Sequence, residues 1–323
     1  MKINLMKSPK VGNSLLVVFT QSDKIKSLET PFGEQFEISS SKEFLNEMKK
    51  TGELSGKKGE MTLIHSFLIE NFTYNSVHLN EKLHPKRILF VGLGNSKDID
   101  NELLRNSAAQ IVKKVESLSL TEFSLIVESS GNNDDSESII AISEGIMLGN
   151  YSFDEFKTNK EKSISINAEL LIEDVDEKNK NALKKSLITS TASIKARNLV
   201  NRPPNVVNPE YLKDFSIDIA NQNENLEIEV FDKNKISELG MRAYLGVAQG
   251  STADPFGVKL THLGDPNNKE NNIWLIGKGI TFDSGGLSLK SSIGMIEMKS
   301  DMSGGAAVIT AMEAISKLNP KIN

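Results

Sequence analysis

The sequence predicts an α/β protein with two domains, and three observations lead to this prediction. Short apolar runs alternate with segments of helical spacing along the first half of the chain. A diproline, Pro203-Pro204, then follows a long amphipathic segment. Beyond it the alternation resumes and leads to a glycine-rich stretch that contains two lysines and two aspartates. A chain of 323 residues is long enough to form two separate cores.

The first domain, placed at residues 1–160, is expected to contain a mostly parallel or mixed sheet with covering helices. In the first part of the chain, four short β-rich runs are bounded by polar or glycine residues and are predicted to be strands: residues 14–20, 87–94, 123–127 and 168–172. Helical spacing between them predicts helices at residues 101–118 and 136–149.

A connecting segment, residues 161–204, is expected to join the domains. Within it, residues 176–201 read as an amphipathic helix with Leu183, Leu187 and Ile194 on one face. The diproline ends this helix, because proline lacks the backbone donor and blocks continuation. We therefore place the domain boundary at Pro203-Pro204.

The second domain, residues 205–323, should open with a helix that Asn208 caps and Pro209 starts. Strands are predicted at residues 226–230 and 258–263, followed by a buried strand at residues 273–276, which reads Ile-Trp-Leu-Ile. This last strand would deliver the glycine-rich loop at its carboxyl end. Apolar residues at helical spacing predict a final helix at 301–318, which Asn319-Pro320 stops.

The composition narrows the classes of function. A formal net charge of −5 argues against nucleic acid or an anionic membrane as the main partner. The absence of cysteine excludes thiolate metal sites and cysteine nucleophiles, and it agrees with a cytoplasmic location. No apolar run is long enough for a membrane span, and the amino terminus lacks the pattern of a secretion signal.

The residues that could carry chemistry are Lys278, Asp283, Lys290 and Asp301. Aspartate oxygens are hard ligands that suit Mg²⁺, Mn²⁺ or Zn²⁺. Beside such a cation the Lys278 ammonium is disfavoured, so this side chain could bind as a neutral amine. Lys290 would remain a cation that polarises a carbonyl and stabilises an oxyanion.

The alternative is that these glycine loops form tight turns whose charges face water. The packing of four charged groups around glycines at the end of a strand favours the site. An imidazole zinc site is not expected, since the four histidines are scattered along the sequence: His65, His78, His84 and His262.

Two other glycine loops are weaker candidates. Residues 92–97 supply the first two glycines of a dinucleotide fingerprint, but Lys97 stands where the third glycine belongs. Residues 246–252 resemble a phosphate loop without its lysine. Both are interpreted as turns.

Met295 and Met298 are most simply core residues, although methionine also suits an adaptable apolar pocket beside a reaction centre.

The glycine-rich stretch resembles the leucine aminopeptidase family of metallopeptidases. Residues 277–286 read Gly-Lys-Gly-Ile-Thr-Phe-Asp-Ser-Gly-Gly, and Lys290 and then Lys-Ser-Asp-Met-Ser-Gly at 299–304 follow them. This combination is highly specific to the family. Residues 144–154 and 196–205 are also similar to its inter-domain segments, and the resemblance extends from about residue 86 onward.

The resemblance implies an amino-terminal α/β (macro-like) domain followed by a catalytic α/β domain with a central mixed sheet. It implies that Lys278 and Asp301 bind the more tightly held of two metal ions and that Asp283 bridges both. Lys290 would contact the substrate carbonyl, and Met298 would line the pocket for the first side chain of a peptide substrate. The complete protein would be a homohexamer with two divalent ions, Mn²⁺ or Zn²⁺, with Mg²⁺ as a further candidate.

The sequence departs from the family at its carboxyl end. The family has a later Asn-Thr-Asp-Ala-Glu-Gly-Arg segment, which supplies two more carboxylate ligands and an arginine, and residues 1–323 do not contain it. Neither Glu297 nor Glu313 lies in a matching motif. We therefore expect a carboxyl-truncated member with an incomplete catalytic domain and reduced affinity for the second metal.

Two functions follow from the sequence. The first is a metal-dependent aminopeptidase, which releases amino-terminal residues by attack of activated water, with activity of the 323-residue chain itself in doubt. The second is a non-catalytic binding or assembly fragment, in which the first domain holds a nucleotide-like ligand or the chain packs through its connecting helix. The preferred amino-terminal residue and the physiological metal are left open.

Overall fold

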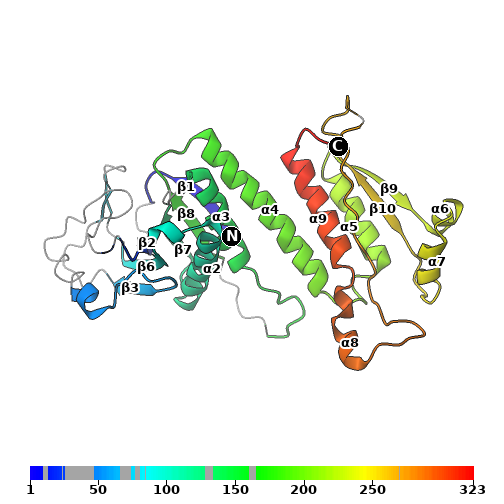
Figure 1. The fold of residues 1–323 in the computed structure, drawn as a ribbon, viewed down its shortest axis with the longest axis horizontal. Helices are drawn as coiled ribbons and strands as arrows, with labels where there is room; N and C mark the ends of the chain where they lie inside the picture. Colours follow the sequence, from blue (N-terminus) through cyan, green and yellow to red (C-terminus); the bar gives the residue numbers. More distant parts are fainter. Residues whose placement is uncertain are drawn as a thin grey trace. The chain divides into compact units, whose positions relative to one another are not determined.

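The computed structural model of the protein describes residues 1–9, 14–23, 25, 47–65, 74–76, 81–83, 85–127, 134–159, 165–268 and 270–323. The chain divides into two compact units, residues 1–187 and 188–323, and the division falls within the helix α4 (Glu177–Asn201). Figure 1 shows the elements of each unit. No helix among the described residues is long and apolar enough to cross a membrane.

The amino-terminal unit is built on a six-stranded mixed sheet with the order β1-β8-β7-β2-β6-β3. All neighbours pair in parallel except β3 and β6, which are antiparallel. The mixed α/β sheet predicted from the sequence is thus confirmed. The strands are β1 (Lys2–Met6), β2 (Leu16–Gln21), β3 (Met61–His65), β6 (Arg87–Gly94), β7 (Glu122–Ile126) and β8 (Asn167–Leu171).

The central strands are buried on both faces, as parallel strands covered on two sides must be. Alternate residues of β2 enter different cores: Val17 and Phe19 pack in one cluster, and Leu16 and Val18 pack in another. The first cluster includes residues of α2 (Asn101–Ser117) and α3 (Asp135–Gly149) and the start of α4. A separate two-stranded antiparallel sheet joins β4 (Tyr74–Ser76) and β5 (Glu81–Leu83).

The helices α2 and α3 lie close together because α3 has glycines four residues apart on the face toward α2. A Cβ on Gly145 would lie 2.1 Å from the Arg105 carbonyl oxygen, and a Cβ on Gly149 would lie 2.7 Å from Ala109 Cα. Only glycine permits this approach. Aspartate caps begin both helices, as Asp100 Oδ1 accepts from the Leu103 N–H and Asp134 Oδ1 accepts from the Ser136 N–H.

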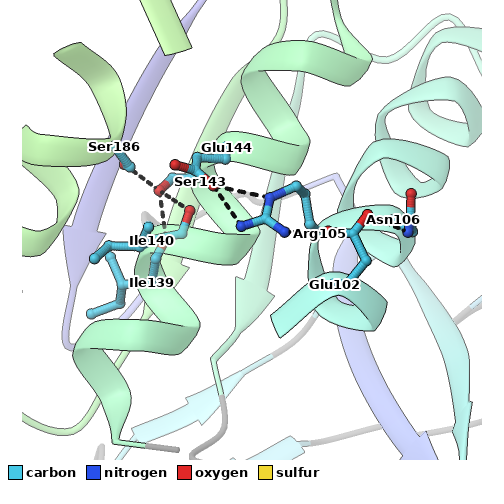
Figure 2. Close-up of polar contacts among 8 residues, drawn as sticks. All are labelled: Glu102, Arg105, Asn106, Ile139, Ile140, Ser143, Glu144 and Ser186. Atoms are coloured by element: carbon cyan, nitrogen blue, oxygen red, sulfur yellow. Dashed lines mark hydrogen bonds and ion pairs between the residues drawn. The ribbon is translucent and has the colours of Figure 1, made fainter. Parts of the chain in front are cut away.

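Polar contacts hold the same helices in place (Figure 2). Arg105 of α2 donates to Glu144 of α3 from Nε at 2.9 Å and from Nη2 at 2.7 Å. On the preceding residue of α3, the hydroxyl of Ser143 lies 2.5 Å from that of Ser186, and this buried pair joins α3 to α4. A short 3₁₀ helix, η2 (Ser96–Asp98), follows β6 in the same unit.

The carboxyl-terminal unit packs α5 (Pro209–Asn221) and α9 (Ser303–Leu318) with the antiparallel pair β9 (Glu227–Phe231) and β10 (Gly257–Thr261). Its core includes Leu199, Leu212, Met302 and Ile309. The predicted cap of α5 is present, since Asn208 Oδ1 accepts from the Tyr211 N–H at 2.8 Å and Pro209 starts the helix. The remaining elements are α6 (Lys233–Glu238), α7 (Arg242–Ala248), α8 (Ser292–Ile296) and η3 (Glu297–Ser300).

The predicted buried strand at residues 273–276 is wrong for this structure. The segment forms no strand, and its four side chains are exposed by 62% for Ile273, 74% for Trp274, 45% for Leu275 and 91% for Ile276. The run is apolar enough for a central strand, but a strand needs partners along its length. Within the described part of the chain, Trp274, Leu275 and Ile276 make no backbone hydrogen bond to another segment.

The glycine contact between α2 and α3 gives a stability prediction. Replacing Gly145 with alanine puts a methyl group against the Arg105 carbonyl, so the first unit should lose about 1–3 kcal/mol of unfolding free energy. Urea denaturation followed by circular dichroism measures this loss. The matched control is Gly246→Ala in α7, where a Cβ meets nothing within 4 Å. An equal effect of the two substitutions would contradict the close-packing argument.

Candidate metal and substrate site

The four charged residues singled out in the sequence all lie in the carboxyl-terminal unit. Lys278, Asp283 and Lys290 belong to the loop of residues 277–290, which leads to α8. Asp301 follows η3 and stands two residues before the start of α9. The structure therefore places the candidate groups on one loop and at one helix start.

Glycines bring these two segments into direct backbone contact. The Gly305 N–H, in the first turn of α9, donates to the Lys278 carbonyl oxygen at 2.7 Å. A Cβ on Gly277 would lie 2.4 Å from the Gly304 carbonyl oxygen. Larger residues at these positions would push the loop away from the helix. The contact sets Lys278 beside Asp301.

Lys278 and Asp301 form the first pair, with Nζ 3.1 Å from Oδ2. The Lys278 side chain is 55% exposed, whereas that of Asp301 is only 16% exposed. Although the ammonium is at ion-pair distance, Asp301 Oδ2 is fully buried and accepts no hydrogen bond from any described residue. The short distance gives charge compensation, and the missing hydrogen bond shows that the ammonium is not oriented to donate. The positive end of the α9 dipole adds further support for a carboxylate here.

Lys290 and Asp283 form the second pair. Lys290 Nζ lies 2.6 Å from Asp283 Oδ2 and also donates to the Asp283 carbonyl oxygen at 3.1 Å. The other carboxylate oxygen accepts from the Gly285 N–H at 2.9 Å. Gly285 has a φ of +92°, a conformation that favours glycine, so this residue type allows the turn that closes the loop.

These contacts shift the acidity of Asp283. The hydrogen bond from Lys290 is the largest cause that lowers the pKa of the Asp283 carboxyl below its ordinary value, and the Gly285 N–H adds to it. Lys278 also lowers this pKa through its charge, which shows that the two pairs are in electrostatic reach of each other. Because the folded-state pKa is depressed, the stabilisation is present at neutral pH and is lost as the pH falls through the folded-state pKa.

Met298 lies beside the second pair. Its sulfur is 3.2 Å from Lys290 Nζ, so η3 brings a polarisable apolar side chain next to the lysine expected to meet a carbonyl. Met295 lies in α8 and is half-buried. This neighbourhood of Met298 and Lys290 was implied only by the family resemblance.

The structure joins each aspartate to one lysine, and the direct contacts stay within the two pairs. Among the described residues, no group of three or more histidine, cysteine, aspartate or glutamate side chains could hold a metal ion. Glu313 is buried in an ion pair with Lys195 at 2.7 Å and contacts Lys317, while Glu297 is exposed. No sequence signal indicated the Lys195–Glu313 pair, because its members are far apart along the chain.

The described histidines and the glycine loop at residues 92–97 have surroundings of their own. His262 is buried, with its ring nitrogens 3.2 Å from the Asn225 carbonyl oxygen and 3.3 Å from that of Pro320. His65 ends β3, and His78 and His84 lie outside the described residues. A Cβ on Gly92 would lie 2.0 Å from the Lys57 carbonyl oxygen, so protein backbone occupies the space that a pyrophosphate would need.

The donor set is compatible with a divalent cation. Asp301 Oδ2 is a buried carboxylate oxygen without a hydrogen bond in the described part of the chain, an arrangement that is costly for an anion alone. Lys278 Nζ lies 3.1 Å from this oxygen, and Asp283 supplies a second carboxylate in the same loop. Oxygen ligands with one nitrogen suit Mn²⁺ or Zn²⁺.

Comparison with family models relates both units to known proteins. The model described as "Cytosol aminopeptidase family, catalytic domain" matches residues 194–323, and the model of the same family's N-terminal domain matches residues 16–160. A probable cytosol aminopeptidase of Alkaliphilus oremlandii is 34% identical over 284 residues, which cover 86% of this chain and 54% of that protein. A probable cytosol aminopeptidase of Clostridium perfringens is 32% identical and is covered to 55%.

Solved structures show the same fold. A mutant of tomato leucine aminopeptidase matches the whole chain and 60% of its own length, with a TM-score of 0.76 and 24% identity. The bottromycin maturation enzyme BotP in complex with Mn matches 95% of this chain and 57% of its own, with a TM-score of 0.70 and 25% identity. The chain thus spans little more than half the length of the relatives that it matches.

The two ion pairs make a prediction about the acidity of Asp283. Substitution Lys290→Met should raise the pKa of the Asp283 carboxyl, because it removes the largest cause of the lowered value. Substitution Lys278→Met should raise it less, since that lysine acts only through its charge. Carboxyl NMR titration of the metal-free chain measures both. A larger effect of Lys278→Met would show that the pairing described here is wrong.

Proposed function

Because the chain belongs to the cytosol aminopeptidase family, we propose that the complete protein is a metal-dependent aminopeptidase that removes amino-terminal residues from peptides. The observation that supports this most directly is the buried Oδ2 of Asp301, which accepts no hydrogen bond and lies 3.1 Å from Lys278 Nζ. Lys278 and Asp301 would hold one divalent ion, and Asp283 would serve as a ligand for that ion and for a second. The metals would be Mn²⁺ or Zn²⁺, with Mg²⁺ as a further candidate.

A bound divalent ion would supply Lewis acidity and would lower the pKa of water at the site. The residues of the chain would do the remaining work. Lys290, whose Nζ is held by Asp283 at 2.6 Å, would place a positive charge where negative charge develops on the substrate carbonyl oxygen. Met298, 3.2 Å from that ammonium, would contact the first side chain of the peptide.

The proposal extends to the organisation of the protein. Residues 1–160 would form the amino-terminal domain, residues 161–204 the connection, and residues 205–323 part of the catalytic domain. The complete protein would act in the cytoplasm as a homohexamer. The support for these points is the family membership together with the two family-model matches.

An alternative function is a non-catalytic binding or assembly role for this chain. One observation favours it: the described residues bring together two carboxylates and two lysines at the site but no third acidic or histidine ligand. A chain of this kind would bind one ion weakly and turn over no peptide. Thermal stabilisation by nucleotides, without a response to Mn²⁺ or Zn²⁺, would support this alternative.

Metal binding by the chain itself can be tested without any assay of activity. Mn²⁺ at about 100 times its dissociation constant should stabilise the folded chain by about 2.7 kcal/mol, seen as a rise in the unfolding temperature. Asp301→Asn should abolish the rise, because it removes the buried carboxylate. The matched control is Glu297→Gln, which makes the same change of charge at an exposed position. Equal stabilisation of all three proteins would rule out the proposed ligand.

Catalysis requires a protein extended by the carboxyl-terminal part that the longer relatives possess. In such a protein, Lys290→Met should lower kcat for a leucine anilide substrate by about 10²–10³-fold, because the developing oxyanion loses its cation. Lys321→Met, an exposed substitution outside the site, should leave kcat unchanged. Activity that persists after all divalent metal ions are removed, or that survives Asp283→Ala, would exclude the proposed mechanism.

A further inference from the structure

The buried carboxylate of Glu313 joins α9, the helix that follows Asp301, to α4. Its side chain is only 4% exposed. Lys195 of α4 donates to its two carboxylate oxygens at 2.7 and 2.8 Å, and Lys317 of α9 donates to one of them. Burial raises the pKa of the Glu313 carboxyl, but the hydrogen bonds from the two lysines outweigh this and lower the pKa overall. The carboxylate is therefore ionised at neutral pH and links the two helices by charge-assisted hydrogen bonds.

A second contact joins the segment before Asp301 to the end of α4. Lys299 lies in η3, two residues before Asp301, and its Nζ donates to the Asn201 carbonyl oxygen at 3.4 Å. Asn201 is the last residue of α4. The last carbonyl groups of a helix carry partial negative charge, so an ammonium group is favoured beside them. Lys299 thus holds η3 at the carboxyl end of α4.

The two contacts place Asp301 between two anchors on α4. The contact nearer the end of α4 is the one before the start of α9, so α9 runs antiparallel to the last part of α4 (Figure 1). Leu199 of α4 and Met302, which directly follows Asp301, belong to one buried apolar cluster. This part of α4 lies in the same compact unit as α9. The position of Asp301 therefore follows from how η3 and α9 are held on α4.

We propose that Lys195 and Lys299 are positioning residues, which hold Asp301 against Lys278 by anchoring η3 and α9 to α4. The link from these anchors to the site is the hydrogen bond from the Gly305 N–H to the Lys278 carbonyl oxygen at 2.7 Å. A shift of α9 on α4 breaks this bond and separates the Asp301 carboxylate from the Lys278 amine. The consequence for metal binding rests on the proposed function, whereas the consequence for the Gly305 hydrogen bond does not.

The charge of Lys195 and Lys299 alone predicts the opposite of a loss of binding. Each is a cation in the unit that carries the candidate metal site, so replacing it with methionine removes a like charge and would strengthen Mn²⁺ binding if charge were its only role. Loss of the anchor would weaken binding instead, since residues that orient a metal ligand typically contribute about 10–100-fold to metal affinity. The sign of the change therefore separates positioning from charge.

Lys317 provides a matched control, because it bonds the same carboxylate as Lys195 but belongs to α9 and so does not join the two helices. The experiment measures Mn²⁺ affinity of the 323-residue chain by electron paramagnetic resonance of the free ion. Lys195→Met and Lys299→Met should each weaken binding by about tenfold. Lys317→Met should not weaken it. Lys299→Arg should bind like the parent, because a guanidinium also donates to the end of a helix.

Amide hydrogen exchange of the metal-free chain tests the anchors without any bound ion. Exchange at the Gly305 N–H should be faster in Lys195→Met and Lys299→Met than in the parent and in Lys317→Met. Unchanged exchange at Ile142 of α3 checks that the fold elsewhere is kept. Faster Gly305 exchange in a chain whose parent binds no Mn²⁺ would support the anchors and contradict the proposed function alone. Unchanged Gly305 exchange, tighter Mn²⁺ binding, or an equal effect of Lys317→Met would overturn the proposal.

Discussion

The candidate site depends on a close backbone contact between glycines. Lys278 sits on a loop and Asp301 precedes a helix, and the two meet because the Gly305 N–H bonds the Lys278 carbonyl while Gly277 lies against Gly304. A Cβ on Gly277 would lie 2.4 Å from the Gly304 carbonyl oxygen, so a larger residue would push the two segments apart. The glycines therefore determine which charged groups become neighbours, and the lysines and aspartates determine the chemistry of that neighbourhood.

Charge compensation is the second requirement. A buried carboxylate such as Asp301 is stable only when positive charge or hydrogen bonds replace the lost water. Lys278 and the amino-terminal end of α9 supply positive charge, but no described residue supplies a hydrogen bond to Oδ2. Asp283, by contrast, has both an ammonium and a backbone N–H. The two aspartates thus differ: Asp283 has hydrogen bonds from the protein, whereas Oδ2 of Asp301 has charge compensation without a hydrogen bond.

Local patterns in the sequence predicted most of the elements, whereas the pairing of strands that are far apart in the chain could not be predicted from those patterns. Helical spacing and caps located α2, α3, α5 and α9 to within a few residues, because these signals act within one or two turns. The strand β1 was missed, since its pairing with β8 joins residues far apart in the chain. The site residues were recognisable from their motif, but which lysine lies beside which aspartate was fixed by the fold of the loop.

The error at residues 273–276 follows from the same difference between local and long-range information. An apolar run indicates that a segment can be buried, but burial itself requires neighbours on both sides. The amino-terminal unit has such neighbours, and of its described large apolar residues only Phe156 is strongly exposed. In the carboxyl-terminal unit the glycine contact with α9 supports the segment just after the run, while the run itself remains uncovered. The site loop is therefore anchored where Lys278 bonds the first turn of α9, whereas the apolar run that leads into it lacks comparable support.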